Sequence, residues 1–413
     1  MIKLNLENIY AAVLGLAIFC LPLGTVFILR SGEINNTAWP LYSIVLYLSE
    51  IVCLVVVASK WQVIQRQFSS KWWKIFGALA LLNILISVSP LASLGLWLHV
   101  ALALAFGLAV ALENDSKPLV KYWLLGALLV GALAGFQVYG NWQGANKLLG
   151  ISSHELAAKT TSVVEVAGER VARGYAAFPH PNILAGYAVL VTLLLLLEIE
   201  TVALRRWRLF IYGGLLAIGQ ILGLSFSRAG ILIFGVIVDW SFIKRPKARL
   251  GAAVALAGLF VALLFFPEAY LTRLQGSGRL ETISNAERVS SVSRTLPLIG
   301  SNLLFGVGFG GSSLATSFSD PGRPAWDYEP PHSLPILIIL EFGFVGLALL
   351  GWFVTSKGEL WARGSYGRQF CLLALIGLGL FDHYLLTSPQ FMLIGGAFLG
   401  TVHVLTKPHG KPS

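Results

Sequence analysis

Residues 223–234, with the sequence GLSFSRAGILIF, join two apolar runs at residues 208–224 and 229–243 through only a few residues. A turn this short between two such runs predicts an antiparallel pair of helices. The second run has about 15 residues, or roughly 22 Å of helix, against about 30 Å for the hydrocarbon core of a bilayer. We therefore expect the turn that carries Arg228 to lie below the membrane surface.

Apolar runs of this kind recur along all 413 residues, of which 56% are hydrophobic and 12% are charged. A soluble domain carries about 25% charged residues, so this composition excludes a water-soluble globule. The chain is predicted to be an all-α integral membrane protein in which residues 1–413 form a single membrane domain. About twelve transmembrane helices are expected, approximately at residues 9–29, 40–59, 73–89, 91–112, 121–140, 182–203, 208–224, 229–243, 250–266, 334–353, 369–386 and 390–406.

The basic residues are spread along the chain rather than gathered in one domain, so the net charge of +10 does not indicate nucleic-acid binding. With the N-terminus in the cytoplasm, 19 of the 30 lysines and arginines fall on the cytoplasmic side, and every loop there is basic. This distribution predicts a multi-pass protein of the bacterial inner membrane with both termini cytoplasmic. Two long loops, at residues 141–181 and 267–333, would then face the periplasm, the second between the ninth and tenth helices.

The loop at residues 267–333 is too long for a simple connector, and we expect it to cap a site. It contains five arginines and no lysine. Guanidinium groups present a rigid fork of donors that suits phosphate, so Arg288 and Arg294 are candidates for substrate binding, although some of the five should only be solvated. Arg228 either extends to the headgroup level or binds a lipid-borne phosphate, and we favour the second interpretation because a membrane-embedded arginine normally has a partner.

Two further stretches carry candidate polar residues. In VARGYAAFPHPNILAGY, at residues 171–187, a proline opens the expected sixth helix, so His180 and Asn182 would lie at its mouth with Arg173 just upstream. The free N–H groups of a helix N-terminus can bind an anion, but ordinary capping explains each residue taken alone equally well.

The other stretch is YEPPHSLPILIILEFGFVG, at residues 328–346. His332 lies where the long loop meets the tenth helix, and its imidazole can accept a proton near neutral pH, or it can simply cap the helix. Glu341 lies within the apolar run, where a carboxylate is either functional or hydrogen-bonded across helices.

Metal and nucleotide motifs are absent from the sequence: it has no P-loop, no H-E-x-x-H and no Cys/His cluster. We therefore expect no metal and no cofactor. Free nucleotide sugars are not available on the periplasmic side, so an energised donor there should be a lipid carrier with a pyrophosphate leaving group.

Four stretches, taken in order, resemble the O-antigen ligase and polymerase superfamily, membrane glycosyltransferases that act on undecaprenyl-pyrophosphate-linked glycans. They are PHPNILAGY at residues 179–187, SFSRAGIL at 225–232, the segment 288–310 that ends in GVGFG, and HSLPILIILEFGFVG at 332–346. The resemblance covers about residues 170–350. Ser333 and Val292 stand where the family often has an asparagine and an aromatic residue.

The resemblance implies that Arg228 and Arg288 bind the donor pyrophosphate and that His332 is the catalytic base or positions the acceptor. It implies metal-independent glycosyl transfer, inverting if displacement is direct, from an undecaprenyl-pyrophosphate-linked glycan to lipid A-core or another glycan acceptor among the membrane lipids. An O-antigen ligase is the favoured activity, and polymerisation of repeat units or glycosylation of pilins are alternatives within the family. A membrane transporter and a non-catalytic assembly partner are the alternatives outside it.

Overall fold

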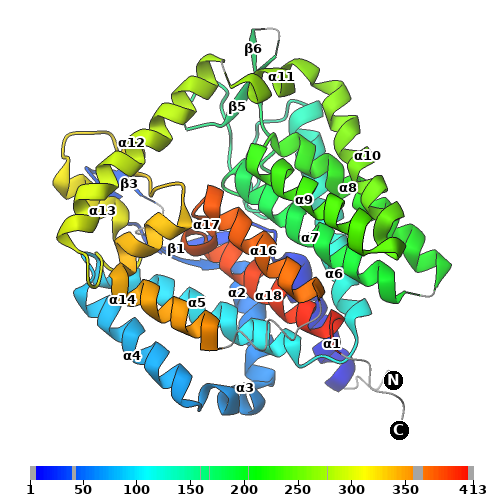
Figure 1. The fold of residues 1–413 in the computed structure, drawn as a ribbon, viewed down its shortest axis with the longest axis horizontal. Coiled ribbons are helices and arrows are strands. Elements are labelled where there is room, and N and C mark those ends of the chain that lie inside the picture. The colour runs from blue at the N-terminus through cyan, green and yellow to red at the C-terminus, as the bar shows by residue number, and fades with distance from the viewer. Residues whose placement is uncertain are drawn as a thin grey trace.

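The computed structural model describes residues 6–39, 43–158, 160–166, 168–202, 204–276, 278–356 and 366–407. Within them the chain is mostly helical (Figure 1). The helices are α1 (Leu6–Cys20), α2 (Leu48–Ser59), α3 (Trp61–Phe68), α4 (Lys71–Ile86), α5 (Pro90–Ala111), α6 (Ser116–Tyr139), α7 (Pro181–Thr201), α8 (Arg205–Ser225), α9 (Arg228–Lys244), α10 (Arg249–Phe265), α11 (Pro267–Gln275), α12 (Arg279–Ser301), α13 (Ser312–Ser319), α14 (Leu334–Ser356), α16 (Tyr366–Phe381), α17 (Tyr384–Thr387) and α18 (Pro389–Leu405), with the 3₁₀ helices η2 (Pro246–Ala248) and η3 (Ala325–Tyr328).

Short strands form three antiparallel pairs, β1 with β4, β2 with β3 and β5 with β6. Their bounds are β1 (Val26–Arg30), β2 (Glu33–Ile34), β3 (Thr37–Ala38), β4 (Ile44–Tyr47), β5 (Val163–Val166) and β6 (Glu169–Ala172).

The helices agree with the predicted membrane class. Each of the twelve predicted runs contains an α-helix. In the described part of the chain, six helices are long and apolar enough to cross a bilayer, and the bent pair α2–α3 makes a seventh if it is one span. Four more apolar helices have only 10–17 residues. A mostly helical, multi-pass membrane protein is therefore supported, while twelve crossings and their direction stay a prediction.

The first two predicted helices are shorter than expected. Helix α1 ends at Cys20, just before Pro22, and α2 begins only at Leu48. Between them β1 pairs with β4 in the register Val26↔Tyr47, so the expected helix over residues 21–29 and 43–47 is wrong; residues 40–42 lie outside the described ranges. The reason is local: proline lacks the N–H that the helix would need, and the β-branched and aromatic residues that follow favour extended backbone.

The long segment at residues 267–333 is largely helical. Helix α12 runs from the end of α11 to the neighbourhood of α13, along one edge of the molecule (Figure 1). The other long segment, residues 141–181, contributes the β5–β6 hairpin, and β5 packs against α11. The two predicted loops therefore meet, at the start of α12.

Helix α7 forms the centre of the bundle. It packs against α6, α8, α9, α16 and α18. Of the residues in its apolar stretch, 94% are buried inside the protein. Two helix pairs beside it, α8 with α10 and α5 with α18, make the most extensive contacts. Both use small residues, which let helix backbones approach closely in a membrane. A Cβ added at Gly258 would lie 2.0 Å from the Leu216 carbonyl oxygen, and one at Gly396 would lie 2.1 Å from that of Ala103.

We expect Gly396→Ala to destabilise the fold, because backbone at Ala103 blocks the new methyl group and α5 and α18 would have to separate. Overpacking of this kind costs about 1–3 kcal/mol. The measurement is the melting temperature of the purified protein in detergent. Gly395→Ala is the matched control, since a Cβ there meets nothing within 4 Å and the gain in helix propensity is the same. Equal melting temperatures for the two variants would contradict the prediction.

Candidate active site

Five of the candidate residues lie at or near helix ends, and the other three lie within α12 and α14. Arg173, His180 and Asn182 precede or open α7, Arg228 opens α9, and His332 lies two residues before α14. Hydrogen bonds and ion pairs connect these ends to one another, to the end of α16 and to the first turn of α12. The connections place the candidates together at one end of the bundle.

A buried arginine begins the connected network. Arg173 donates from Nε to the Ser225 carbonyl oxygen at 2.8 Å and from Nη2 to Oδ1 of Asn182 at 2.9 Å. Asn182 in turn donates from Nδ2 to Oδ2 of Asp382 at 2.8 Å. Burial lowers the pKa of Arg173, but a guanidinium keeps its charge at neutral pH. One buried cation thus joins the end of α8 and the start of α7 to the residue that follows α16.

Asp382 and His332 form the next link. The Nδ1 atom of His332 lies 3.6 Å from Oδ1 of Asp382, and its Nε2 atom lies 3.8 Å from Oε2 of Glu329. Burial favours the uncharged form of Asp382, yet the imidazoles of His332 and His383 hold the pKa of its carboxyl well below the usual range. Burial also opposes charge on His332, but Asp382 and Glu329 outweigh it and raise the pKa of that imidazole. The two residues therefore form an aspartate–histidine pair.

Two neighbouring histidines are held neutral. His180 accepts a hydrogen bond from the backbone N–H of Asn182 at its Nδ1 atom, 3.1 Å away, and its Nε2 atom is 3.1 Å from Oγ of Ser162. Burial, with Arg173 nearby, lowers the pKa of His180 to about 3. Burial also lowers the pKa of His383 to about 4. Of these three imidazoles, only that of His332 has its pKa raised.

Arg228 lies in a second cluster. Its Nη1 atom is 3.1 Å from Oε2 of Glu281, whose Oε1 atom is 3.0 Å from Nη1 of Arg273. The tight turn before α9 puts Arg228 there: Phe226 adopts a left-handed conformation with φ of 50°, and Ser227 caps α9 by accepting from the Gly230 N–H. One acid in the first turn of α12 thus bridges two arginines from different elements.

Arg288 lies between the two clusters. It is half-buried on α12, and its positive charge opposes protonation of both Arg273 and His332, as burial of those two side chains does more strongly. Its guanidinium forms no hydrogen bond or ion pair with the part of the chain that the structure describes. Arg288 is thus close enough to both Arg273 and His332 for its charge to act on each.

Two predicted candidates lie apart from this site. Arg294 donates from Nη2 to the Asp327 carbonyl oxygen at 2.8 Å and so fastens α12 to η3. Glu341 is fully buried in α14, and its Oε1 atom accepts from the Ser312 N–H at 3.4 Å. Both contacts stabilise the segment between α12 and α14, and neither residue touches Arg173, Asp382 or His332 in the described structure.

Sequence reasoning missed Asp382 and gave Glu281 and Arg273 no role. Asp382 lies in LGLFDHYLL, inside a run predicted to cross the membrane at residues 369–386, where a carboxylate is a functional candidate by default. That rule selected Glu341 and would also have selected Asp382. No sequence pattern distinguishes Glu281 from the other acids of its polar segment.

Three of these side chains could also hold a metal ion. His332, Asp382 and His383 each offer one donor atom, and the three atoms lie within 4.8 Å of one another. Two imidazoles and a carboxylate suit a transition metal. The expectation of a metal-free site therefore needs a direct test.

The central part of the chain matches a known protein family. Residues 212–351 match the model of the family described as O-antigen ligase. The matched segment contains Arg228, Arg288 and His332, and the match confirms the resemblance drawn from the sequence. Comparison with curated proteins finds no match.

Replacing Asp382 with asparagine should lower the pKa of His332, because the charge that raises it is removed while burial and Arg288 still oppose protonation. The neutral imidazole would then persist at lower pH. Since diethyl pyrocarbonate modifies only neutral imidazole, mass spectrometry of the His332 peptide across a pH series measures the shift. Asp320→Asn is the control, because it changes an acid that precedes η3 in the chain. It should leave the pH midpoint of the His332 modification in place. An unmoved or higher midpoint in Asp382→Asn would refute the assigned pair.

Proposed function

We propose that this chain, which carries the O-antigen ligase family segment at residues 212–351, is a membrane glycosyltransferase. It moves a glycan from undecaprenyl pyrophosphate to an acceptor hydroxyl on the periplasmic side of the bacterial inner membrane. The activity proposed in full is that of an O-antigen ligase with lipid A-core as acceptor, and a polymerase of the same superfamily is the alternative. The observation that supports the proposal is the pairing of His332 with Asp382, in a chain whose neighbouring helix α12 carries Arg288 and meets Arg228 and Arg273 through Glu281.

The arginines bind the leaving group. Arg228 and Arg288 hold the donor diphosphate, for which guanidinium groups provide paired donors. As the bond between the anomeric carbon and the phosphate oxygen breaks, negative charge grows on that oxygen. Fixed cations in a water-poor site stabilise this charge more in the transition state than in the bound donor, and this difference accelerates the reaction.

His332 activates the acceptor. In its neutral form it takes the proton of the acceptor hydroxyl while the oxygen attacks the anomeric carbon from the face opposite the leaving diphosphate, so the configuration inverts. Asp382 faces the Nδ1 atom of His332. From there its carboxylate orients the ring and stabilises the imidazolium that forms. Asn182, at the start of α7, donates to Asp382 and is itself held by Arg173, which follows β6.

Arg228→Ala, Arg288→Ala and His332→Ala should each lower glycan transfer by at least about 10²-fold, the usual effect of removing a general base or an oxyanion donor. The measurement is conversion of a lipid-linked oligosaccharide by the purified enzyme, with the surface glycan of a complemented deletion strain as a second readout. Arg279→Ala is the control, because that side chain is 70% exposed and only pairs with Glu165 at the surface. Transfer at the wild-type rate in any of the three variants would remove that residue from the site. Long unattached polymer in the deletion strain would indicate a ligase, and single repeat units on the core a polymerase.

Transfer should persist in a chelator such as EDTA, since the proposed reaction uses only arginine, histidine and aspartate side chains. The rate is measured before and after exhaustive chelation, with and without added Mn²⁺ or Zn²⁺. Loss of activity that a divalent ion restores would contradict the metal-independent mechanism. It would instead make His332, Asp382 and His383 the ligands of a required metal.

A further inference from the structure

Glu281 pairs with Arg228, the arginine to which the proposed function assigns a donor phosphate. Its side chain is 6% exposed, and each of its two oxygens faces one guanidinium, Arg228 at 3.1 Å and Arg273 at 3.0 Å. A carboxylate held this way presents two anionic oxygens to two guanidinium groups, as a phosphate would. The arginine assigned to the donor is therefore already paired with an internal anion.

Donors remain unused around this carboxylate. The buried Nε atom of Arg273 has no hydrogen-bond partner in the described structure, and Nη2 of Arg228 makes only a 3.4 Å contact with Asn285. Buried polar groups without partners are uncommon, and these donors are free to bind the oxygen atoms of an added anion. With Arg288, the cluster holds three positive charges against the one negative charge of Glu281, an excess of two. This excess fits an anion with more charge than a carboxylate.

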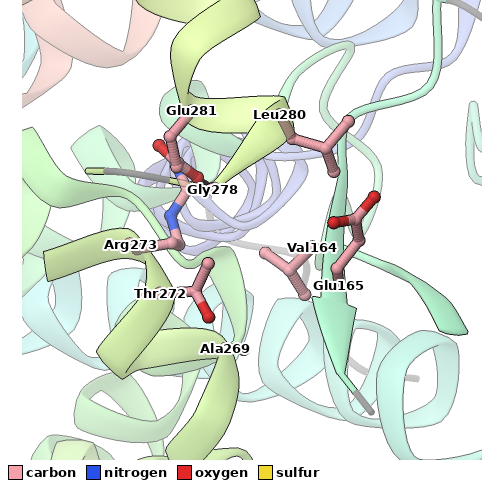
Figure 2. A pocket seen from close by; sticks show the side chains of 8 residues that line it. All are labelled: Val164, Glu165, Ala269, Thr272, Arg273, Gly278, Leu280 and Glu281. Carbon is pink, nitrogen blue, oxygen red and sulfur yellow. Dashed lines mark hydrogen bonds and ion pairs between the residues drawn. The ribbon is translucent and has the colours of Figure 1, made fainter. Parts of the chain in front are cut away.

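The pocket that Arg273 and Glu281 line is too small for a phosphate. Figure 2 shows the Arg273 and Glu281 side chains lining a pocket between the start of α12 and strand β5, with Glu165 on its opposite wall. The space in this pocket is about 10 Å³, enough for roughly one water molecule. A phosphate that enters this pocket to bind Arg273 must therefore replace the carboxylate rather than join it. Because Glu281 lies in the first turn of α12, displacing that turn is sufficient.

We propose that Glu281 is a built-in competitor of the donor, which holds the subsite of one donor phosphate closed until a diphosphate displaces it. Binding transfers Arg228 and Arg273 from the carboxylate to the phosphate, so Arg273 becomes a further phosphate ligand. The identity of the ligand rests on the proposed function. The device confers selectivity: a membrane phospholipid offers a single phosphodiester charge and competes poorly with Glu281, whereas a diphosphate offers more charge to the same arginines.

The test titrates inorganic pyrophosphate, and separately inorganic phosphate, into the purified full-length protein by calorimetry. Glu281→Gln keeps the shape of the side chain but removes its charge. We expect it to bind pyrophosphate at least tenfold more tightly than the wild type and to lose much of the preference for pyrophosphate over phosphate. Arg273→Gln should weaken pyrophosphate binding at least tenfold, alone and combined with Glu281→Gln.

Glu165→Gln is the matched control, because it removes an acid from the opposite wall of the same pocket and should leave both affinities unchanged. Unchanged or weaker pyrophosphate binding in Glu281→Gln, with binding still abolished by Arg228→Gln, would overturn this inference and leave the proposed function standing. Absence of pyrophosphate binding in the wild type and in Glu281→Gln alike would overturn both.

Glu281→Asp covers the case in which the glutamine variant does not fold, since breaking a buried ion pair can be strongly destabilising. The shorter acid keeps its charge but cannot span both arginines. It should raise the affinity for pyrophosphate several-fold, and an affinity equal to that of the wild type would also overturn the proposal.

Discussion

The hydrogen bonds of the Arg173 guanidinium fix the geometry on which the site depends. A buried arginine is tolerated only where its donors are satisfied, and here they reach the last residue of α8 and, through Asn182, the carboxylate that follows α16. The start of α7 supplies the bridging amide, and α7 is the central helix of the bundle. Three helix ends are thereby held at fixed separations. The positions of the Arg228 turn and of His332, which faces Asp382, follow from this one fastening.

Environment rather than residue type separates the histidines of the site. His180 and His383 are held neutral by burial, and they act as hydrogen-bonding groups for a helix cap and for the side chain of Thr387. His332 is buried as well, but two carboxylates face its two ring nitrogens, and their charge outweighs the cost of desolvation. The placement of acids around the ring, and not the residue type, thus sets His332 apart from the other two histidines.

The sequence predicted what depends on local composition. Apolar runs located the helices, and the turn at Arg228, the proline at the start of α7 and the junction before α14 located the arginines and the histidine. The predicted helix ends were wrong between Cys20 and Leu48. There a proline and β-branched residues favour a strand over a helix. The partners Asp382 and Glu281 could not be paired with His332 and Arg228, because 50 and 53 residues separate them along the chain and only the packing of α16 and α12 brings them together.

The segment that matches the family does not make the site alone. It supplies Arg228, Arg288 and His332, the groups that would face the substrates, but the residues that position them lie outside it. Arg173 and Asn182 come before residue 212, and Asp382 comes after residue 351. Without the buried cation and its amide bridge, Asp382 would lose a hydrogen-bond donor, and an acid left partly unpaired inside a protein tends to take up a proton. His332 would then lose the charge that raises its basicity. The chemistry assigned to the matched segment therefore requires the helices on both sides of it, and the functional unit is the whole bundle.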